Sequence, residues 1–377
     1  MGTAVALAPQ IDEYLESICE KLQLPPSKYK LAEDRYVTVA QWLGAEGSQL
    51  ASFRPLIYPQ GSFLIGTTTQ PFGRKEFDLD FVCQLMADWR LFKSPLVLLD
   101  LLEARFKDHS KYKSMYERRN RCIALYYKDD FYMDILPACP DSEGGGTCIR
   151  VPDRKAKVWK ASNPKGYGIW FESKAELPPH IVKGYIEPVP AQEDAEEKSP
   201  LKLAVQLLKR RRDIMFLNDC DNAPISIVLT TLAAQHYRQE TSVNLALMGI
   251  LTGITTTIQQ VPPGGRLRVL NPSNTKEDLS ERWEDNQEAW RAFVRFVTSF
   301  EQKWQRLNRE HGIDAIAAVL EEMFGDEPIR TVVREKALAM QSKRETQQLS
   351  VKRSSGIIVG TGIVDSIRVP RNTFYGK

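Results

Sequence analysis

Residues that build zinc sites and disulfide frameworks are scarce in this sequence. Its 377 residues include six cysteines and four histidines, and no two cysteines form a C-x-x-C pair. Zinc-ligand spacing is therefore absent. The scattered cysteines are expected to be reduced core residues of a cytoplasmic protein. A chain of this length buries a sizeable core without such cross-links.

The chain also lacks long apolar runs and a strong charge of either sign. No apolar stretch is long enough to span a bilayer, and residues 1–10 carry no basic region ahead of an apolar one, so neither a membrane anchor nor a signal peptide is expected. The formal net charge of +3 is too small to require a nucleic-acid partner. Positive charge gathers only in residues 329–377, where ten Lys and Arg face three Asp and Glu. Without a sustained apolar period, this end predicts a partly extended basic tail.

The hydrophobic period changes twice along the chain. Helical spacing near the N-terminus gives way to short alternating segments, and helical patterns return after an acidic connection at 187–198. This order predicts a mixed α/β fold with an α-helical lobe and a cleft between them. We expect an N-terminal core over 1–198, a helical lobe over 199–345 and the basic tail over 346–377. The segments expected to be strands are 55–60, 77–85, 121–127 and 131–137, and the later helices are expected at 199–216, 224–237, 281–308 and 312–324.

Alternation in the segment Phe77-Asp78-Leu79-Asp80-Phe81 indicates a strand with one acidic face. Because successive side chains of a strand point to opposite faces, the apolar residues point into a core and the two aspartates share the other face. Carboxylates this close repel each other unless a cation neutralises them, and a hard divalent metal ion with oxygen ligands is the natural occupant. A D-x-D pair alone is also common on solvated strand faces, so it needs support from other segments.

A third carboxylate is placed by the same alternation. In residues 131–137 the apolar side chains share one face and Asp134 lies opposite. Residues 122–127 and 131–137 predict a hairpin, one strand of which runs beside Asp78 and Asp80. Three acids on adjacent strands are the arrangement that holds two Mg²⁺ ions, or Mn²⁺ in their place, about 3.5–4 Å apart for nucleotidyl transfer.

A glycine turn precedes the acidic strand. Gly61 and Ser62 open the hydroxyl-rich loop GSFLIGTTT over 61–69. Glycine lets a turn approach phosphates closely, and backbone N–H groups and the Ser62 hydroxyl donate to them. The turn, the D-x-D pair and Asp134 together predict a catalytic site.

In this order, G-S, D-x-D and a later lone Asp resemble the pattern of the DNA polymerase β-like nucleotidyltransferases. Over about residues 10–330 the chain more narrowly resembles the bacterial cGAS/DncV-like nucleotidyltransferases (CD-NTases). The resemblance implies a polymerase β-like fold of α/β (α+β) class. It also implies synthesis of cyclic di- or trinucleotide second messengers from NTPs, ATP among them, in bacterial anti-phage (CBASS) signalling. The stretches that carry it are YPQGSFLIGT (58–67), EFDLDFVCQL (76–85), YMDILPA (132–138), VPDR (151–154), SNPKGYGIWF (162–171), SPLKLAVQLLKRRRD (199–213) and PISIVLTTLAA (224–234).

The resemblance further implies how the site is divided. Asp78 and Asp80 would ligate both metal ions, and Asp134 would complete the ion that activates the attacking 3′-hydroxyl. The leaving pyrophosphate would be held by the second metal ion, by the Gly61-Ser62 turn and by cations from the other lobe. Gln60, just before the turn, is a further candidate for binding the nucleotide.

Lys209 is the expected cation for that pyrophosphate, although residues 210–212 are also basic and a solvated face is the alternative. Ser226 lies in the first turn of the helix expected at 224–237, where free N–H groups favour a phosphate; a simple capping hydroxyl is the alternative. Asn163, with the aromatic residues that follow it, is a candidate for reading a base edge. Its Asn-Pro step is equally typical of a turn.

Two rival functions share part of this pattern. A nucleotidyltransferase that modifies an RNA end, a protein hydroxyl or a small molecule would need the same turn and acids, but not the later motifs. A catalytically silent binding or scaffold protein would show no metal-dependent nucleotide turnover. The sequence does not decide between two and three joined nucleotides.

Two partners are implied by the family alone. Some CD-NTases need a HORMA-like activator. Others are conjugated by ubiquitin-transfer-like enzymes through a C-terminal glycine, and Gly376 is the candidate here, followed by Lys377. The alternative for this end is a basic tail that is not conjugated.

Overall fold

The computed structural model describes residues 4–73, 76–128, 131–175, 185–352, 358–360 and 366–369. The chain divides into two compact units, Met1–Arg309 and Glu310–Lys377. The predicted boundary after residue 198 falls inside the first unit and stays a prediction. Among the described helices, none is both long enough and apolar enough to cross a membrane.

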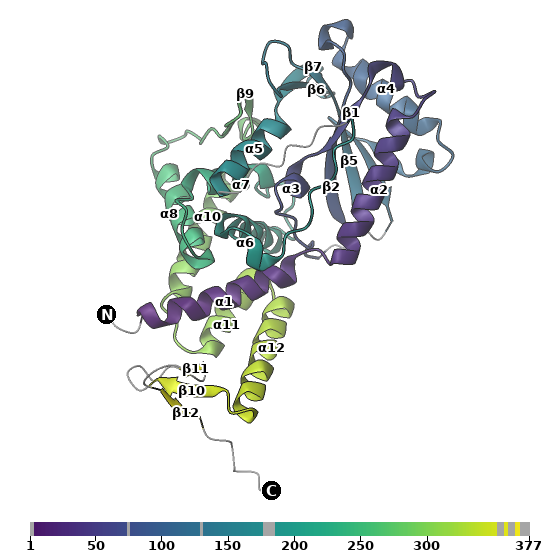
Figure 1. Ribbon diagram of the computed structural model, residues 1–377. Helices are drawn as coiled ribbons and strands as arrows, with labels where there is room; N and C mark the ends of the chain where they lie inside the picture. The colour runs from purple at the N-terminus through teal and green to yellow at the C-terminus, as the bar shows by residue number, and fades with distance from the viewer. Residues whose placement is uncertain are drawn as a thin grey trace. The chain divides into compact units, whose positions relative to one another are not determined.

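A mixed sheet of seven strands forms the centre of one side of the first unit (Figure 1). Its spatial order is β1-β2-β5-β4-β3, and β6 joins β5 to β7. Strands β2 and β5 run parallel, whereas the other pairs are antiparallel. The predicted hairpin is confirmed as β4 and β5, and β5 is the strand that lies beside the acidic strand β2. The strands are β1 (Leu56–Pro59), β2 (Phe77–Gln84), β3 (Tyr116–Arg118), β4 (Ile123–Tyr127), β5 (Phe131–Pro140), β6 (Ile149–Asp153) and β7 (Val158–Ser162).

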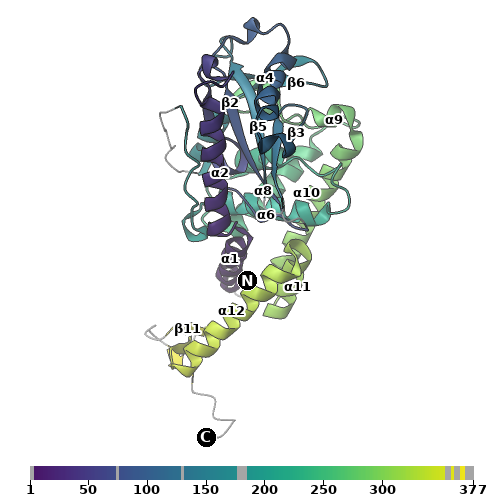
Figure 2. The same cartoon turned by 90° about the vertical axis from the view of Figure 1, so that its right-hand side faces the viewer.

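One face of this sheet is closed by α2 (Pro26–Gly44) and α4 (Pro95–Lys107) (Figure 2). Leu79 and Phe81 of β2 are fully buried there, in one cluster with Tyr36 of α2. Burying such side chains contributes about 1.5–3 kcal/mol each. Since the apolar residues of β2 are committed to this face, the pleat turns its aspartates to the other one.

The helical side of the first unit surrounds α6, whose residues are buried over most of its length. The helix expected at 199–216 is confirmed as α6, and the Ser199 side chain caps it by accepting from the Lys202 N–H. The predicted helix at 224–237 begins two residues late, at Ser226, because Ile225 is extended. The helices gathered here are α1 (Ala4–Leu22), α3 (Gly61–Leu64), α5 (Pro164–Ala175), α6 (Pro200–Met215), α7 (Ser226–His236), α8 (Val243–Gln259), α9 (Arg282–Asp285) and α10 (Gln287–Leu307).

Several elements of this unit are not predicted from the sequence. The helix α5 is not predicted, because Asn-Pro and Lys-Gly at its start are equally typical of a turn. The helix α8 is also not predicted, although its buried residues, among them Leu247, Ile250, Leu251 and Ile254, recur at helical spacing. Strands β6 and β7 and the small hairpin of β8 (Leu270–Asn271) with β9 (Asn274–Asp278) were also not predicted.

The second unit contains α11 (Ile313–Phe324), α12 (Asp326–Glu345) and a three-stranded sheet of order β11-β10-β12. Its strands are β10 (Leu349–Lys352), β11 (Ile358–Gly360) and β12 (Ser366–Arg368). Part of the predicted extended tail is therefore paired into a sheet. Gly376, the predicted conjugation site, lies outside the described residues.

Candidate active site

The three predicted carboxylates come together on the face of β2 and β5 that α2 and α4 leave free. Asp80 is the direct register partner of Asp134, and Asp78 is the partner of Tyr132. Asp78 is exposed, while Asp80 and Asp134 are half-buried. Parallel pairing of the two strands thus joins acids that are more than fifty residues apart in sequence.

The surroundings of Asp80 disfavour the charged form of its carboxyl group. Burial raises the pKa of Asp80 well above its usual range, and the carboxylates of Asp78 and Asp134 raise it further, while Lys209 and Arg119 oppose the shift. Burial also raises the pKa of Asp134, although Arg119 acts in the opposite direction. Taking carboxylates out of water disfavours their charged form, and like charges add to the cost. The structure therefore holds acids that a nearby cation would stabilise.

The glycine turn lies directly on this acidic face. Gly61 has a φ of 61°, and a Cβ at this position would lie 2.5 Å from the Oδ2 atom of Asp80. The Gln60 N–H donates to the Asp80 carbonyl at 2.9 Å. Glycine is needed here both for its left-handed backbone and for the close approach.

Lys209 of α6 holds the loop that follows the turn. Its Nζ donates to the carbonyl and to the hydroxyl of Thr67, both at 3.0 Å. One turn earlier on α6, Gln206 donates to the Thr68 carbonyl at 2.7 Å. Burial lowers the pKa of Lys209 to about 8, with the carboxylates of Asp78 and Asp80 acting against the shift. The ammonium group is thus a buried cation between the hydroxyl-rich loop and the acids.

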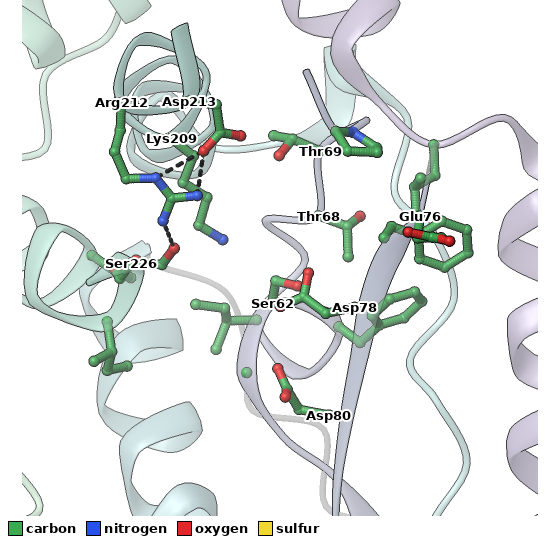
Figure 3. Close-up of a pocket in the computed structure, with 18 of the residues that line it drawn as sticks. Ser62, Thr68, Thr69, Glu76, Asp78, Asp80, Lys209, Arg212, Asp213 and Ser226 are labelled. Atoms are coloured by element: carbon green, nitrogen blue, oxygen red, sulfur yellow. Dashed lines mark hydrogen bonds and ion pairs between the residues drawn. The ribbon is translucent and has the colours of Figure 1, made fainter. Parts of the chain in front are cut away.

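A cavity of about 390 Å³ opens between the sheet and α6 (Figure 3). Asp78 and Asp80 face it from β2, and Lys209 and Arg212 face it from α6 (Figure 3). The other predicted residues that line it are Gly61, Ser62 and Ser226.

Arg212 is a pocket residue that the sequence analysis did not single out. It donates to the hydroxyl of Ser226 and, through Nε, to Asp213 at 2.8 Å. A signal was available, because Lys209 and Arg212 are three residues apart on a helix and therefore share a face.

A second cavity, of about 600 Å³, adjoins the first. The two share Gly61, Ile65, Asp80 and Ile227 in their linings, and Gln60 lines only the second. No sequence motif predicts this cavity, because its cations come from separate segments of the chain. These cations are Arg121, Lys160, Arg268, Lys276 and Arg282.

Asn163 is a helix cap in this structure. Its Oδ1 accepts from the Gly166 N–H at 3.1 Å and from the Thr147 hydroxyl at 2.8 Å, and its Nδ2 donates to the Ser273 carbonyl at 3.1 Å. The side chain is buried and does not line either cavity. Asn163 therefore caps the start of a helix, and the base-reading role stays a prediction. Tyr167, four residues later, does line the second cavity.

Arg119 was missed altogether. This residue follows β3, and its Nη1 donates to both carboxylate oxygens of Asp134, at 2.7 and 3.0 Å. Burial works to lower the pKa of Arg119, but Asp134 and the Tyr126 hydroxyl raise it above its ordinary value. The guanidinium is therefore a permanent positive charge at the acidic face.

The donor set fits a hard divalent cation, because carboxylate oxygens are the ligands that Mg²⁺ and Mn²⁺ prefer. Within the described ranges, however, no three His, Cys, Asp or Glu side chains are gathered closely enough to hold a metal ion together. Asp134 is ion-paired with Arg119 instead. The chemistry of the site suits the metal, while the third ligand is engaged by a cation of the protein itself.

Comparison with known proteins identifies the family. A model of the Second Messenger Oligonucleotide or Dinucleotide Synthetase (SMODS) domain matches residues 10–174. A c-di-GMP synthase from Roseivirga ehrenbergii is 32% identical over 373 residues, which cover 97% of each chain. The chain is a CD-NTase.

Solved structures agree with this assignment. CdnG from Bradyrhizobium diazoefficiens in complex with GTP has a TM-score of 0.72 at 25% identity, covering 87% of this chain and 99% of that one. CdnC from Escherichia coli, in a complex with HORMA-deltaN, has a TM-score of 0.59 at 13% identity, covering 83% and 96%, and so shares the fold. The predicted fold class is confirmed.

The activity that the family resemblance implied is also confirmed. This CD-NTase is a nucleotidyltransferase that makes cyclic oligonucleotide second messengers from NTPs, an activity of bacterial anti-phage signalling. A transferase for an external acceptor and a silent scaffold, the two rivals, are thereby disfavoured.

Proposed function

We propose that this CD-NTase joins two nucleotides into a cyclic dinucleotide, with GTP as the first substrate to test. The proposal draws on the relatives, since the one from Roseivirga ehrenbergii is a c-di-GMP synthase and CdnG was solved with GTP. A cyclic dinucleotide needs two NTPs bound side by side, and two adjoining cavities are available for them. ATP, the substrate expected from the resemblance, remains a competitor that the same experiment tests.

The observation that carries the proposal is that the two cavities meet at the acidic face. Gly61 and Asp80 line both of them, so the acidic face lies where two substrates would touch. A nucleophile and its target held together in this way react as if in one molecule.

We assign the first cavity to the donor nucleotide. Its triphosphate would lie against the Gly61 and Ser62 turn, with Lys209, Arg212 and Ser226 on the opposite wall. These groups supply N–H and O–H donors and two positive charges for the pyrophosphate that leaves. The second cavity would take the acceptor nucleotide. It is lined by five cations and by the carboxylates of Asp80, Glu277, Asp278, Glu281 and Glu284.

In each transfer the 3′-oxygen of the acceptor forms a bond to the α-phosphorus of the donor. The bond from that phosphorus to the bridging oxygen breaks, pyrophosphate leaves and the hydroxyl proton is released. The reaction occurs twice, so that the linear product closes on itself. Asp78, Asp80 and Asp134 would hold two Mg²⁺ ions, or Mn²⁺ in their place. Bound there, the ions would lower the pKa of the hydroxyl and neutralise charge on the phosphates.

The test is mass spectrometry of the product formed from four equimolar NTPs with Mg²⁺ or Mn²⁺. We expect a phosphatase-resistant cyclic dinucleotide that contains guanine, and the same product from GTP alone. Asp80→Asn is the matched control, because it keeps the size of the side chain and removes the charge. A cyclic trinucleotide, or a product without guanine, would refute the proposal, while a lack of product with Asp80→Asn alone would support the assignment of the site.

We also propose, from the family, that a HORMA-like activator or a ubiquitin-transfer-like enzyme acts on this chain. The CdnC complex with HORMA-deltaN is a property of that protein. Conjugation through Gly376 rests on the sequence alone. Tandem mass spectrometry of the chain isolated from its host would reveal a conjugate at Gly376 after loss of Lys377.

A further inference from the structure

Arg119 lies at the acidic face but has no role in the proposed reaction. Its guanidinium is bound at three points: by the two oxygens of Asp134, by the Tyr126 hydroxyl at 2.8 Å, and by the ring of Tyr132, whose centroid lies 4.6 Å away. Tyr126 in turn donates to Glu117 at 2.7 Å. A side chain fixed in this way is part of the architecture of the site.

The ion pair of Arg119 engages a residue of the proposed metal site. Asp134 is one of the three proposed metal ligands, and both of its oxygens already accept from Arg119. The Cys122 thiol reaches the same carboxylate. The side chains of Arg119 and Asp134 are only 31% and 19% exposed, so water screens the pair incompletely.

We propose that Arg119 is a resident counter-ion of the metal site, which holds Asp134 in place before the divalent cation arrives and then opposes its binding. This inference rests on the metal dependence proposed above. It makes Arg119 a positioning residue that sets the cation concentration at which the site fills.

Electrostatic interactions fix the sign of both effects of Arg119. Without a metal ion, three carboxylates repel one another, and a positive charge bonded to one of them lowers that cost. With a metal ion, the same positive charge repels a 2+ ion at the neighbouring oxygens. Arg119 should therefore stabilise the metal-free protein and weaken cation binding. A purely structural arginine would do only the first.

The experiment compares Arg119→Gln with Arg118→Gln. Arg118 is the adjacent residue, and it forms an ion pair of the same kind with Asp100 and Glu103, at 2.6 and 2.7 Å, away from the acidic face. Mn²⁺ binding is measured without nucleotide by calorimetry and electron paramagnetic resonance, and the melting temperature is measured in EDTA.

We expect both variants to melt at lower temperature in EDTA. Arg119→Gln should bind Mn²⁺ about fivefold or more tightly than the wild type, whereas Arg118→Gln should bind it with wild-type affinity. Arg119→Lys keeps the positive charge, so it should bind Mn²⁺ as weakly as the wild type does. It replaces Arg119→Gln in the comparison if the Gln variant does not fold.

The inference is overturned if Arg119→Gln leaves Mn²⁺ affinity unchanged or weakens it. Failure of the metal proposal itself looks different. In that case wild-type protein would bind no Mn²⁺, or its binding would be insensitive to Asp80→Asn.

Discussion

At the scale of single residues, the carboxylate of Asp80 controls how the site responds to pH. Burial and two neighbouring carboxylates raise its pKa, so the folded protein binds a proton there more tightly than the unfolded chain does. Stability then falls as pH rises from about 4, where an unfolded Asp ionises, until the raised pKa of the folded state is passed. Below that range both states are protonated and the penalty is absent.

Asp80→Asn removes this ionisation. We expect the variant in EDTA to melt at higher temperature than the wild type at neutral pH, and to lose the part of the pH dependence that lies above pH 4. Product formation should be abolished, because a proposed metal ligand is lost. Thermal melting from pH 4 to pH 8 checks the first expectation, and equal melting temperatures across that range would contradict it.

Lys209 is the second residue whose charge depends on its surroundings. Because burial lowers its pKa to about 8, the free enzyme loses this positive charge as pH rises through 8. The negative phosphates of a bound NTP favour the charged form, so the apparent Michaelis constant for NTP should rise between pH 7 and pH 9.

Steady-state kinetics of Lys209→Arg test this expectation, since arginine stays charged and the rise should disappear. Lys202→Met is the matched control on the same helix. Lys202 is buried between Glu172 and Glu193 and does not line either cavity. That variant should lose stability and keep the pH dependence of the wild type.

At the scale of elements, the turn from β1 into α3 brings the proposed phosphate-binding loop onto the acidic strand. Gly61→Ala should lose about 1–2 kcal/mol from its left-handed backbone alone. The added Cβ would also collide with Asp80, so we expect product formation to fall at least about 100-fold.

Gly145→Ala is the control, because Gly145 also has a positive φ, of 67°, but nothing lies within 4 Å of an added Cβ. It should lose a similar backbone energy and keep its activity. Denaturant unfolding and product yield of the two variants are the measurements. Equal activities would show that the close approach of Gly61 to Asp80 is unimportant.

The helices and strands also differ in how well the sequence predicts them. Strand β2 was predicted to within a residue, because its period-two alternation is strong and both faces have a clear character. Helix α5 was missed, because the local turn signals at Asn163 and Gly166 serve a different end: the asparagine caps the helix and the glycine leaves room for it. Local chemistry alone does not distinguish a turn from a capped helix start.

At the scale of the whole molecule, ligand binding should act on one of two compact units. The site residues all belong to residues 1–309. A nonhydrolysable GTP analogue with Mg²⁺ should stabilise that unit by about 2.7 kcal/mol at a hundred times its dissociation constant.

Scanning calorimetry measures this effect. The transition of the first unit should move upward, and any separate transition of residues 310–377 should stay where it was. EDTA or the Asp80→Asn substitution should abolish the upward shift. A shift that persists in EDTA would show that the nucleotide binds without the divalent cation.

The sequence by itself determined which three acids form the site, that they share the sheet face opposite the core, and that a glycine turn precedes them. Alternation in a strand is a local property, so a few residues are enough to set it. Only the tertiary structure decided that Arg119 pairs with Asp134 and that a second cavity adjoins the first. It also decided that Lys209 reaches the loop after Gly61. These are meetings of side chains from distant segments, and no local spacing encodes which of many charged residues will be brought together when the chain folds.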